Sequence, residues 1–138
     1  MTDLHSHIIF DVDDGSNSIE ESIELIKKLK SVGFDNIIMT PHYIEGSDYC
    51  STNKEKINKL KRLRNEVKNN NIDINLYLGN EIFINDHIID GIKEGKIYTL
   101  NNTKYLLFEL PFHNQILGLF INGEYQGVYE LSHLKEKK

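Results

Sequence analysis

The chain has 138 residues, of which 39% are hydrophobic and 9% aromatic, and it carries a formal net charge of −5. This length predicts one domain with a buried core, and the negative charge argues against a general nucleic-acid binder. The single cysteine, Cys50, excludes an internal disulfide and fits a reducing, cytoplasmic location. The N-terminus lacks the basic and apolar regions of a signal peptide, and no apolar run approaches membrane-spanning length, so we expect no membrane insertion.

The first 41 residues predict a strand, a loop, a helix and a second strand. Leu4 to Ile9 is typical of a short strand, and Phe10 to Asn17 of a loop. Ser18-Ile19-Glu20-Glu21 has the pattern of a capping box. Helical spacing of Ile19, Ile23, Ile26 and Leu29 follows, and Gly33 ends that helix. A second strand is predicted over Asn36 to Thr40, which Pro41 stops.

The middle of the chain continues the alternation of helices and strands. Thr52-Asn53-Lys54-Glu55 predicts a second capped helix, with lysine and arginine side chains on its solvent face. Its apolar face consists of Ile57, Leu60, Leu63 and Val67, and the run Asn69-Asn70-Asn71 closes it. The later elements are a strand with Ile74, Leu76 and Leu78, a short helix over Asn85 to Glu94 before Gly95, and an apolar strand over Tyr105 to Leu110. Strands separated by helices predict an α/β fold with a parallel sheet.

The C-terminal part has a different pattern. Ile116 to Ile121 and Glu124 to Tyr129 flank Asn122-Gly123, which is a strong hairpin signal. We therefore expect a hairpin-like or poorly ordered tail over residues 116–138, with a solvated end at 135–138, and no single helix across Leu117 to Tyr129.

Imidazole and carboxylate side chains gather where the predicted strands end. His5 and His7 alternate on the first strand, His42 follows Pro41, and Glu81 follows the third strand. Parallel strands bring such residues to one edge of a sheet, where they would suit a cluster of divalent metal ions. Taken singly, the histidines also fit surface or loop positions. Glu109 lies within an apolar strand, where a metal or a basic partner would offset the burial of its carboxylate.

The acidic run Asp11-Val12-Asp13-Asp14-Gly15 has two interpretations. It is typical of a turn, and one of its carboxylates also suits a bridging or second-metal ligand. Other catalytic patterns are absent: the sequence has no glycine-rich phosphate loop and no G-x-S-x-G, and no arginine loop follows Cys50. His87, His113 and His133 are most simply surface residues.

Several of these segments, taken in order, resemble one enzyme family. They are Asp3-Leu4-His5-Ser6-His7, Asp11-Val12-Asp13-Asp14-Gly15, Glu20-Glu21-Ser22, Thr40-Pro41-His42, Gly79-Asn80-Glu81-Ile82 and Leu100 to Phe112. The chain resembles, over about residues 1–115, the manganese-dependent protein-tyrosine phosphatases of the PHP superfamily (the CpsB/YwqE type). These enzymes are encoded with bacterial capsule and exopolysaccharide machinery.

The resemblance implies a distorted (β/α)7 barrel with three metals at the C-terminal ends of its strands. It implies that His5, His7 and Glu81 hold the first metal, that Glu81 and Glu109 hold the second, and that Asp14 and His42 serve the third. Manganese is the expected ion, with iron or zinc as alternatives. The implied partner is a phosphotyrosine protein, such as a bacterial tyrosine kinase.

The family pattern continues beyond this length with an Ala-His-Pro-Glu-Arg segment, an Asp-x-His pair and a further arginine, none of which occurs here. We therefore expect a truncated member: an N-terminal half barrel over residues 1–115 and a tail over 116–138 that departs from the family. Two other functions stay open. One is an inactive remnant that binds metal or a partner kinase, with His133 as a possible substitute ligand. The other is a small-molecule phosphoesterase of the histidinol-phosphatase type.

Overall fold

The computed structural model describes residues 1–109, 115–121 and 124–131, and the chain divides into a unit Met1–Phe108 and a unit Glu109–Lys138. The first unit is α/β and contains two small sheets with parallel strand pairs. No helix within the described residues is long and apolar enough to cross a membrane.

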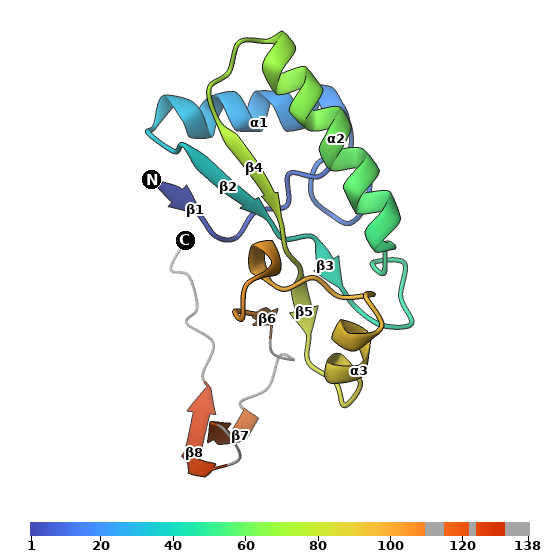
Figure 1. Cartoon of the computed structure of the whole chain (residues 1–138), viewed down its shortest axis with the longest axis vertical. Helices are drawn as coiled ribbons and strands as arrows, with labels where there is room; N and C mark the ends of the chain where they lie inside the picture. Colours follow the sequence, from blue (N-terminus) through green and yellow to red (C-terminus); the bar gives the residue numbers. More distant parts are fainter. Residues whose placement is uncertain (110–114, 122–123, 132–138) are drawn as a thin grey trace. The chain divides into compact units, whose positions relative to one another are not determined.

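The first sheet has the strand order β1-β2-β4 (Figure 1). Its strands are β1 (Thr2–Asp3), β2 (Asn36–Met39) and β4 (Asn75–Leu78), and they pair in parallel. Its central strand β2 is apolar and largely buried, because it lies between two strands and beneath helices.

Helices α1 (Ile19–Ser31) and α2 (Asn53–Asn69) pack against each other and against this sheet (Figure 1). Ser18 caps α1, since its Oγ accepts a hydrogen bond from Glu21 N at 3.2 Å. The Glu21 carboxylate accepts from Asn17 N at 2.7 Å, one residue earlier than in a standard capping box. Thr52 caps α2 in the same way, with 3.2 Å from its Oγ1 to Glu55 N. Both predicted helices are therefore present with their predicted caps.

The second sheet has the order β3-β5-β6, and the sequence did not predict its first two strands. It consists of β3 (His42–Tyr43), β5 (Glu81–Phe83) and β6 (Leu107–Glu109). Pro41 interrupts the pairing after β2, as predicted, but the chain resumes as β3 directly afterwards. The backbone N of Glu81 donates to the Pro41 carbonyl at 3.1 Å. The break between β2 and β3 therefore lies beside the break between β4 and β5. Consequently His42 and Glu81 begin strands rather than follow them.

The predicted strand over Leu4 to Ile9 is wrong. Pairing with β2 stops at Asp3, and Ser6 N donates instead to the side-chain Oγ1 of Thr40 at 3.0 Å. The backbone then turns into a loop that closes on itself, because Ser16 N donates to the carbonyl of His7 at 3.0 Å. Ile8 and Ile9 of this segment are buried, but in a loop, and Leu4 is exposed.

Two later elements are shorter than predicted. The helix expected over Asn85 to Glu94 is α3 (Ile88–Lys93), because the Asn85 side chain accepts from His87 N at 2.8 Å and forms a turn first. The strand expected from Tyr105 begins at Leu107, since the Tyr105 carbonyl accepts from Leu100 N at 2.9 Å beside the 3-10 turn η1 (Leu100–Asn102).

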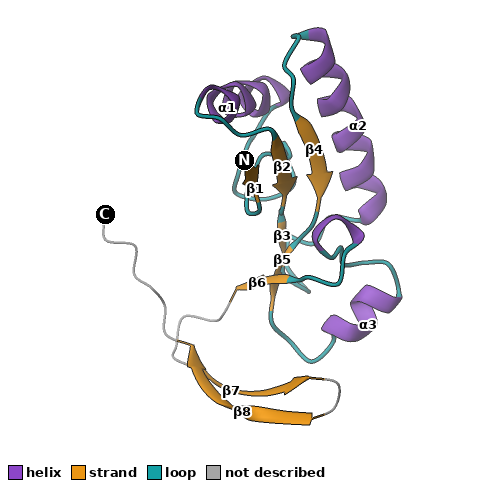
Figure 2. Ribbon diagram, turned by 60° about the vertical axis from the view of Figure 1, so that its left-hand side comes forward, coloured by secondary structure: helices purple, strands orange, loops and turns teal. Residues whose placement is uncertain are grey.

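In the second unit, β7 (Gln115–Ile121) and β8 (Glu124–Leu131) pair antiparallel, with Ile121 opposite Glu124 (Figure 2). These are the two strands of the predicted hairpin, and a helix across this segment is excluded. Asn122, Gly123 and residues 132–138, His133 among them, lie outside the described residues, as do Leu110 to Asn114.

Candidate metal centre

Three side chains from distant parts of the sequence meet at one carboxylate oxygen. The Nε2 atoms of His5 and His7 lie 3.1 Å apart, and each lies 3.1 Å from Oε2 of Glu81. The two histidines flank Ser6, whose carbonyl accepts from the backbone N of Thr40 at 2.7 Å at the end of β2. This anchor keeps the alternation that puts both imidazoles on one side of the backbone, although the segment is not a strand.

The three donor atoms fit a metal ion. An ion above a triangle with 3.1 Å edges can lie about 2.0–2.2 Å from each corner, which is the usual range for imidazole nitrogen and carboxylate oxygen ligands. Two imidazoles and a carboxylate suit manganese, iron and zinc alike. This donor set therefore supports a divalent metal site.

Asp13 holds His7 in place through the ring nitrogen that does not face Glu81. Its fully buried carboxylate accepts from His7 Nδ1 at 2.8 Å, from His42 N at 2.9 Å and from Gly15 N at 3.0 Å. A carboxylate on Nδ1 keeps the proton there and leaves Nε2 as the metal-facing nitrogen. Sequence reasoning named Asp14 as the ligand of this run and missed the part of Asp13, which depends on contacts the turn pattern does not contain.

These contacts change the protonation of the site. The hydrogen bond to Asp13, and to a smaller extent the one to Glu81, raises the pKa of His7 from 6.5 to about 10. Burial acts to raise the pKa of Glu81, but the hydrogen bond from His7 and the nearby His5 and His42 hold it below its usual value. Burial likewise opposes ionisation of Asp13, and its three hydrogen bonds nonetheless lower its pKa. A cation that binds Nε2 of His7 must therefore displace a proton.

Gly15 is required by the closeness of its loop to His7. A Cβ at position 15 would collide with both the carbonyl oxygen and the Cβ of His7. Only glycine allows the acidic run to pass so near the imidazole. The tight turn therefore delivers Asp13 and Asp14 to the metal centre.

A second group of donors adjoins the first. His42 lies opposite Glu81 in the β3–β5 register, with 3.3 Å from its Nδ1 to Glu81 Oε2 and 3.4 Å from its Nε2 to Asp14 Oδ1. Its ring centroid is 4.5 Å from that of His7, and Tyr49 stacks beside it at 5.9 Å. Donor atoms of His7, Asp13, Asp14 and His42 all lie within 4.8 Å of one another.

Five of the six predicted ligands therefore come together within the first unit. They are His5, His7, Asp14, His42 and Glu81. Glu109 is the first residue of the second unit, and its part in the ligand set stays a prediction.

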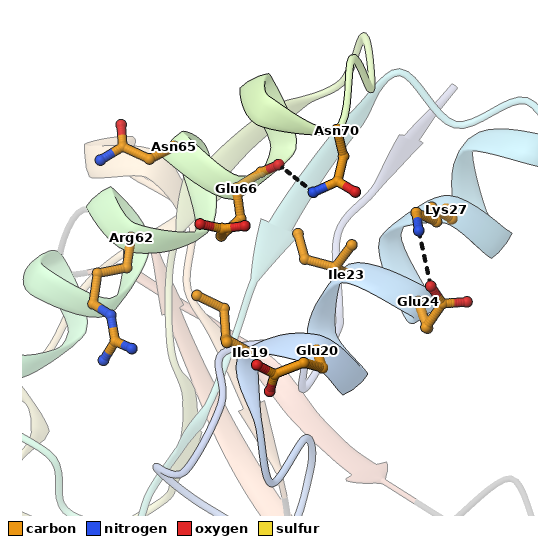
Figure 3. A pocket seen from close by; sticks show the side chains of 9 residues that line it. All are labelled: Ile19, Glu20, Ile23, Glu24, Lys27, Arg62, Asn65, Glu66 and Asn70. Carbon is orange, nitrogen blue, oxygen red and sulfur yellow. Dashed lines mark hydrogen bonds and ion pairs between the residues drawn. The ribbon is translucent and has the colours of Figure 1, made fainter.

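A surface groove of about 480 Å³ lies between α1 and α2, and its lining contains none of the six predicted ligands (Figure 3). Ile19 and Ile23 form an apolar part, and Lys27 pairs with Glu24 at 2.9 Å on its rim. The groove lacks the convergent donor atoms of the metal centre, so we place the candidate site at Glu81.

Comparison with known proteins gives one family and several named relatives of this chain. A family model described as capsular polysaccharide synthesis, CpsB/CapC, matches residues 1–121. The chain is 44% identical over 111 residues to the "Putative tyrosine-protein phosphatase CapC" of Staphylococcus aureus, covering 80% of this chain and 43% of the relative. It is 35% identical over 114 residues to the tyrosine-protein phosphatase CpsB of Streptococcus pneumoniae, covering 82% of this chain and 46% of the relative.

Solved structures of YwqE from Bacillus subtilis and CpsB from Streptococcus pneumoniae are described as unique metal-dependent tyrosine phosphatases. The match among them has a TM-score of 0.70 at 28% identity and covers 81% of this chain and 45% of that chain. The chain thus spans less than half the length of the curated relatives that it matches.

Proposed function

Because the chain belongs to the CpsB/CapC family of capsular polysaccharide synthesis proteins, we propose that it carries the metal-binding part of a protein-tyrosine phosphatase site. The proposed reaction is hydrolysis of phosphotyrosine by a metal-activated water, with manganese as the ion. The observation that carries this proposal is the meeting of His5, His7 and Glu81 at 3.1 Å. The names of the relatives as tyrosine-protein phosphatases support it.

The residues of the chain have separate tasks in this proposal. His5, His7 and Glu81 hold one ion, Glu81 and Glu109 a second, and Asp14 with His42 a third. When bound, such ions would polarise a phosphoryl oxygen and lower the pKa of a bound water to about 7. Asp13 keeps the His7 proton on Nδ1, away from the ion.

The proposed setting follows from the family. We infer that the substrate is a phosphotyrosine protein of capsule or exopolysaccharide synthesis, for example a bacterial tyrosine kinase. The half barrel over residues 1–115, the separate tail over 116–138 and the cytoplasmic location stay predictions. The family match itself extends to residue 121.

A second function, metal binding without rapid turnover, is favoured by the position of the arginines. The sequence has two, Arg62 and Arg64, and both lie on α2. Arg62 lies over the Phe10 ring at 4.8 Å, and the guanidinium of Arg64 donates to the carbonyl of Leu76. Neither supplies a cation for a phosphoryl group at Glu81, and one missing charge-stabilising group typically costs about 10²–10³ in rate.

Manganese titration and turnover by the 138-residue chain test both functions. We expect calorimetry to show manganese binding that Glu81→Gln abolishes, since the substitution removes the negative charge of the carboxylate that both imidazoles contact. Glu24→Gln, the same change at an exposed residue of α1 outside the ligand set, is the control. Turnover is measured with a phosphotyrosine peptide and, as the competing small-molecule substrate, histidinol phosphate.

Hydrolysis of the peptide that depends on manganese and Glu81 would establish the phosphatase function. Binding without hydrolysis would favour the second function, and a preference for histidinol phosphate would favour the small-molecule phosphoesterase. A chain that binds no manganese would contradict the metal centre.

A further inference from the structure

Lys56 is a fully buried lysine behind the metal centre. It lies on α2 and is 1% exposed, contrary to the expectation that the lysines of this helix face solvent. The ion pairs of this stretch of α2 are made by Lys59, which contacts Glu55 and Asp11, and not by Lys56. The Lys56 ammonium instead lies 5.5 Å from the ring centroid of Tyr98 and donates to the side chain of Asn80.

Asn80 is a completely buried amide whose atoms all have partners. Its Oδ1 accepts from Lys56 Nζ at 2.9 Å and from Tyr98 N at 2.8 Å. Its Nδ2 donates to the carbonyl of Pro41 at 3.1 Å. Because both ends of the amide are held, its orientation is set by contacts with two distant segments and a helix.

These contacts fall at the two positions that precede metal-site residues. Pro41 immediately precedes His42, and Asn80 immediately precedes Glu81. The Pro41 carbonyl accepts from both Asn80 Nδ2 and the backbone N of Glu81. The lysine therefore ends a chain of hydrogen bonds that ties the β2–β3 break to the β4–β5 break.

A structural role alone does not account for a lysine here. Burying an ammonium is unfavourable, and an apolar side chain of similar length would fill the same space without that desolvation. Asn80 Oδ1 would keep the donor Tyr98 N if the lysine were replaced. A buried charge at a contact that braces both ligand-bearing strands suggests a contribution to the site.

We propose that Lys56 and Asn80 are positioning residues that set the separation of His42 and Glu81 for metal binding. The ammonium fixes the Asn80 amide, the amide fixes the Pro41 carbonyl, and the two ligand-bearing strands keep their register. This inference rests on the proposed metal centre and deepens it, because it adds two residues that orient the ligands without belonging to the ligand set. Residues that orient metal ligands typically contribute about 10–100-fold to metal affinity.

Manganese affinity of the full chain tests the pair. Calorimetry, with electron paramagnetic resonance of the bound ion, would compare wild type with Asn80→Ala and Lys56→Met. Both variants should bind manganese at least about tenfold more weakly. Lys61→Met, an exposed lysine change on the same helix, should bind like wild type. Metal-free thermal unfolding would show that Lys56→Met is no less stable than wild type, which separates positioning from folding.

The charge of Lys56 makes the test directional. If the lysine acted only through its charge, Lys56→Met would remove a repulsion and strengthen manganese binding. Unchanged or stronger binding by Lys56→Met therefore overturns the proposal, even if Asn80→Ala fails to fold. Weaker binding by Lys56→Met, with no further loss in the double variant beyond Asn80→Ala, supports it. A wild-type chain that binds no manganese would overturn the proposed function itself, which is a different result.

Discussion

The candidate metal centre depends on a few atoms that several side chains contact. Oε2 of Glu81 lies 3.1 Å from His5 and His7 nitrogens and 3.3 Å from Nδ1 of His42. Asp13 plays the matching part underneath, since it accepts hydrogen bonds from both the loop and β3. At this scale each carboxylate serves several partners, so removing one changes more than one contact.

Replacing Asp13 with asparagine should weaken manganese binding by about 10–100-fold. The amide would place a donor against N–H groups that now meet carboxylate oxygens, and His7 would lose its orientation. Titration of the full chain with manganese measures the change. Asp11→Asn is the matched control, because Asp11 belongs to the same loop but its side chain is exposed. Wild-type affinity in Asp13→Asn would show that the carboxylate does not orient the ligand.

The elements were predictable where the chain has a long periodic pattern. Both long helices follow from apolar spacing and caps, and α2 shows its predicted apolar face. Strands of two or three residues such as β3 and β5 have no periodicity to detect, so these two strands of the second sheet were missed. Five candidate ligands that the structure brings together were named from residue type, residue order and family resemblance, which do not depend on strand structure. Lys56 was misplaced because its partner, Asn80, is distant in sequence and no local pattern contains that contact.

The burial of Lys56 predicts how stability changes with pH. Desolvation lowers the pKa of Lys56 from 10.5 to about 8. Between these values the unfolded chain binds more protons, so the contribution of Lys56 to stability improves as pH rises through this window. The shift corresponds to roughly 3 kcal/mol.

Urea unfolding of wild type and Lys56→Met at a series of pH values measures this effect. The free energy of unfolding of Lys56→Met, relative to that of wild type, should be highest at pH 7. This difference should shrink by roughly 3 kcal/mol on approaching pH 10.5. His7, whose pKa is raised to about 10, loses its stabilisation between pH 6.5 and 10, but it does so in both proteins and cancels in the difference. A difference that does not vary with pH would show that Lys56 titrates normally in the folded chain.

At the scale of the whole molecule, the first unit contains a dense set of candidate ligands, and both arginines of the sequence make their contacts elsewhere, with Phe10 and Leu76. The five ligands span residues 5–81, within the part of the chain that matches the family model. The relatives are more than twice as long as the matched region. We expect the part of the relatives beyond the match to supply further phosphate-binding charges.

A chimera tests this expectation. Residues 1–109, which include all six predicted ligands, would be joined in frame to the part of the Staphylococcus aureus relative that follows its counterpart of Glu109. We expect manganese-dependent hydrolysis of a phosphotyrosine peptide at least about 10² faster than by the 138-residue chain, because cationic groups would be added. His5→Ala in the chimera should abolish it. Equal rates in the chimera and the chain would contradict the need for added charges.

The meeting of three separate segments at Glu81 also affects the energetics of folding. The candidate ligands come from before α1, from the start of β3 and from the start of β5, so the proposed centre exists only when all three segments have docked. An ion that binds this assembled state and not the disordered chain stabilises it by mass action, by about 2.7 kcal/mol at a concentration 100 times its dissociation constant. Manganese availability in the cell would then govern how much of the protein persists, in addition to what it does.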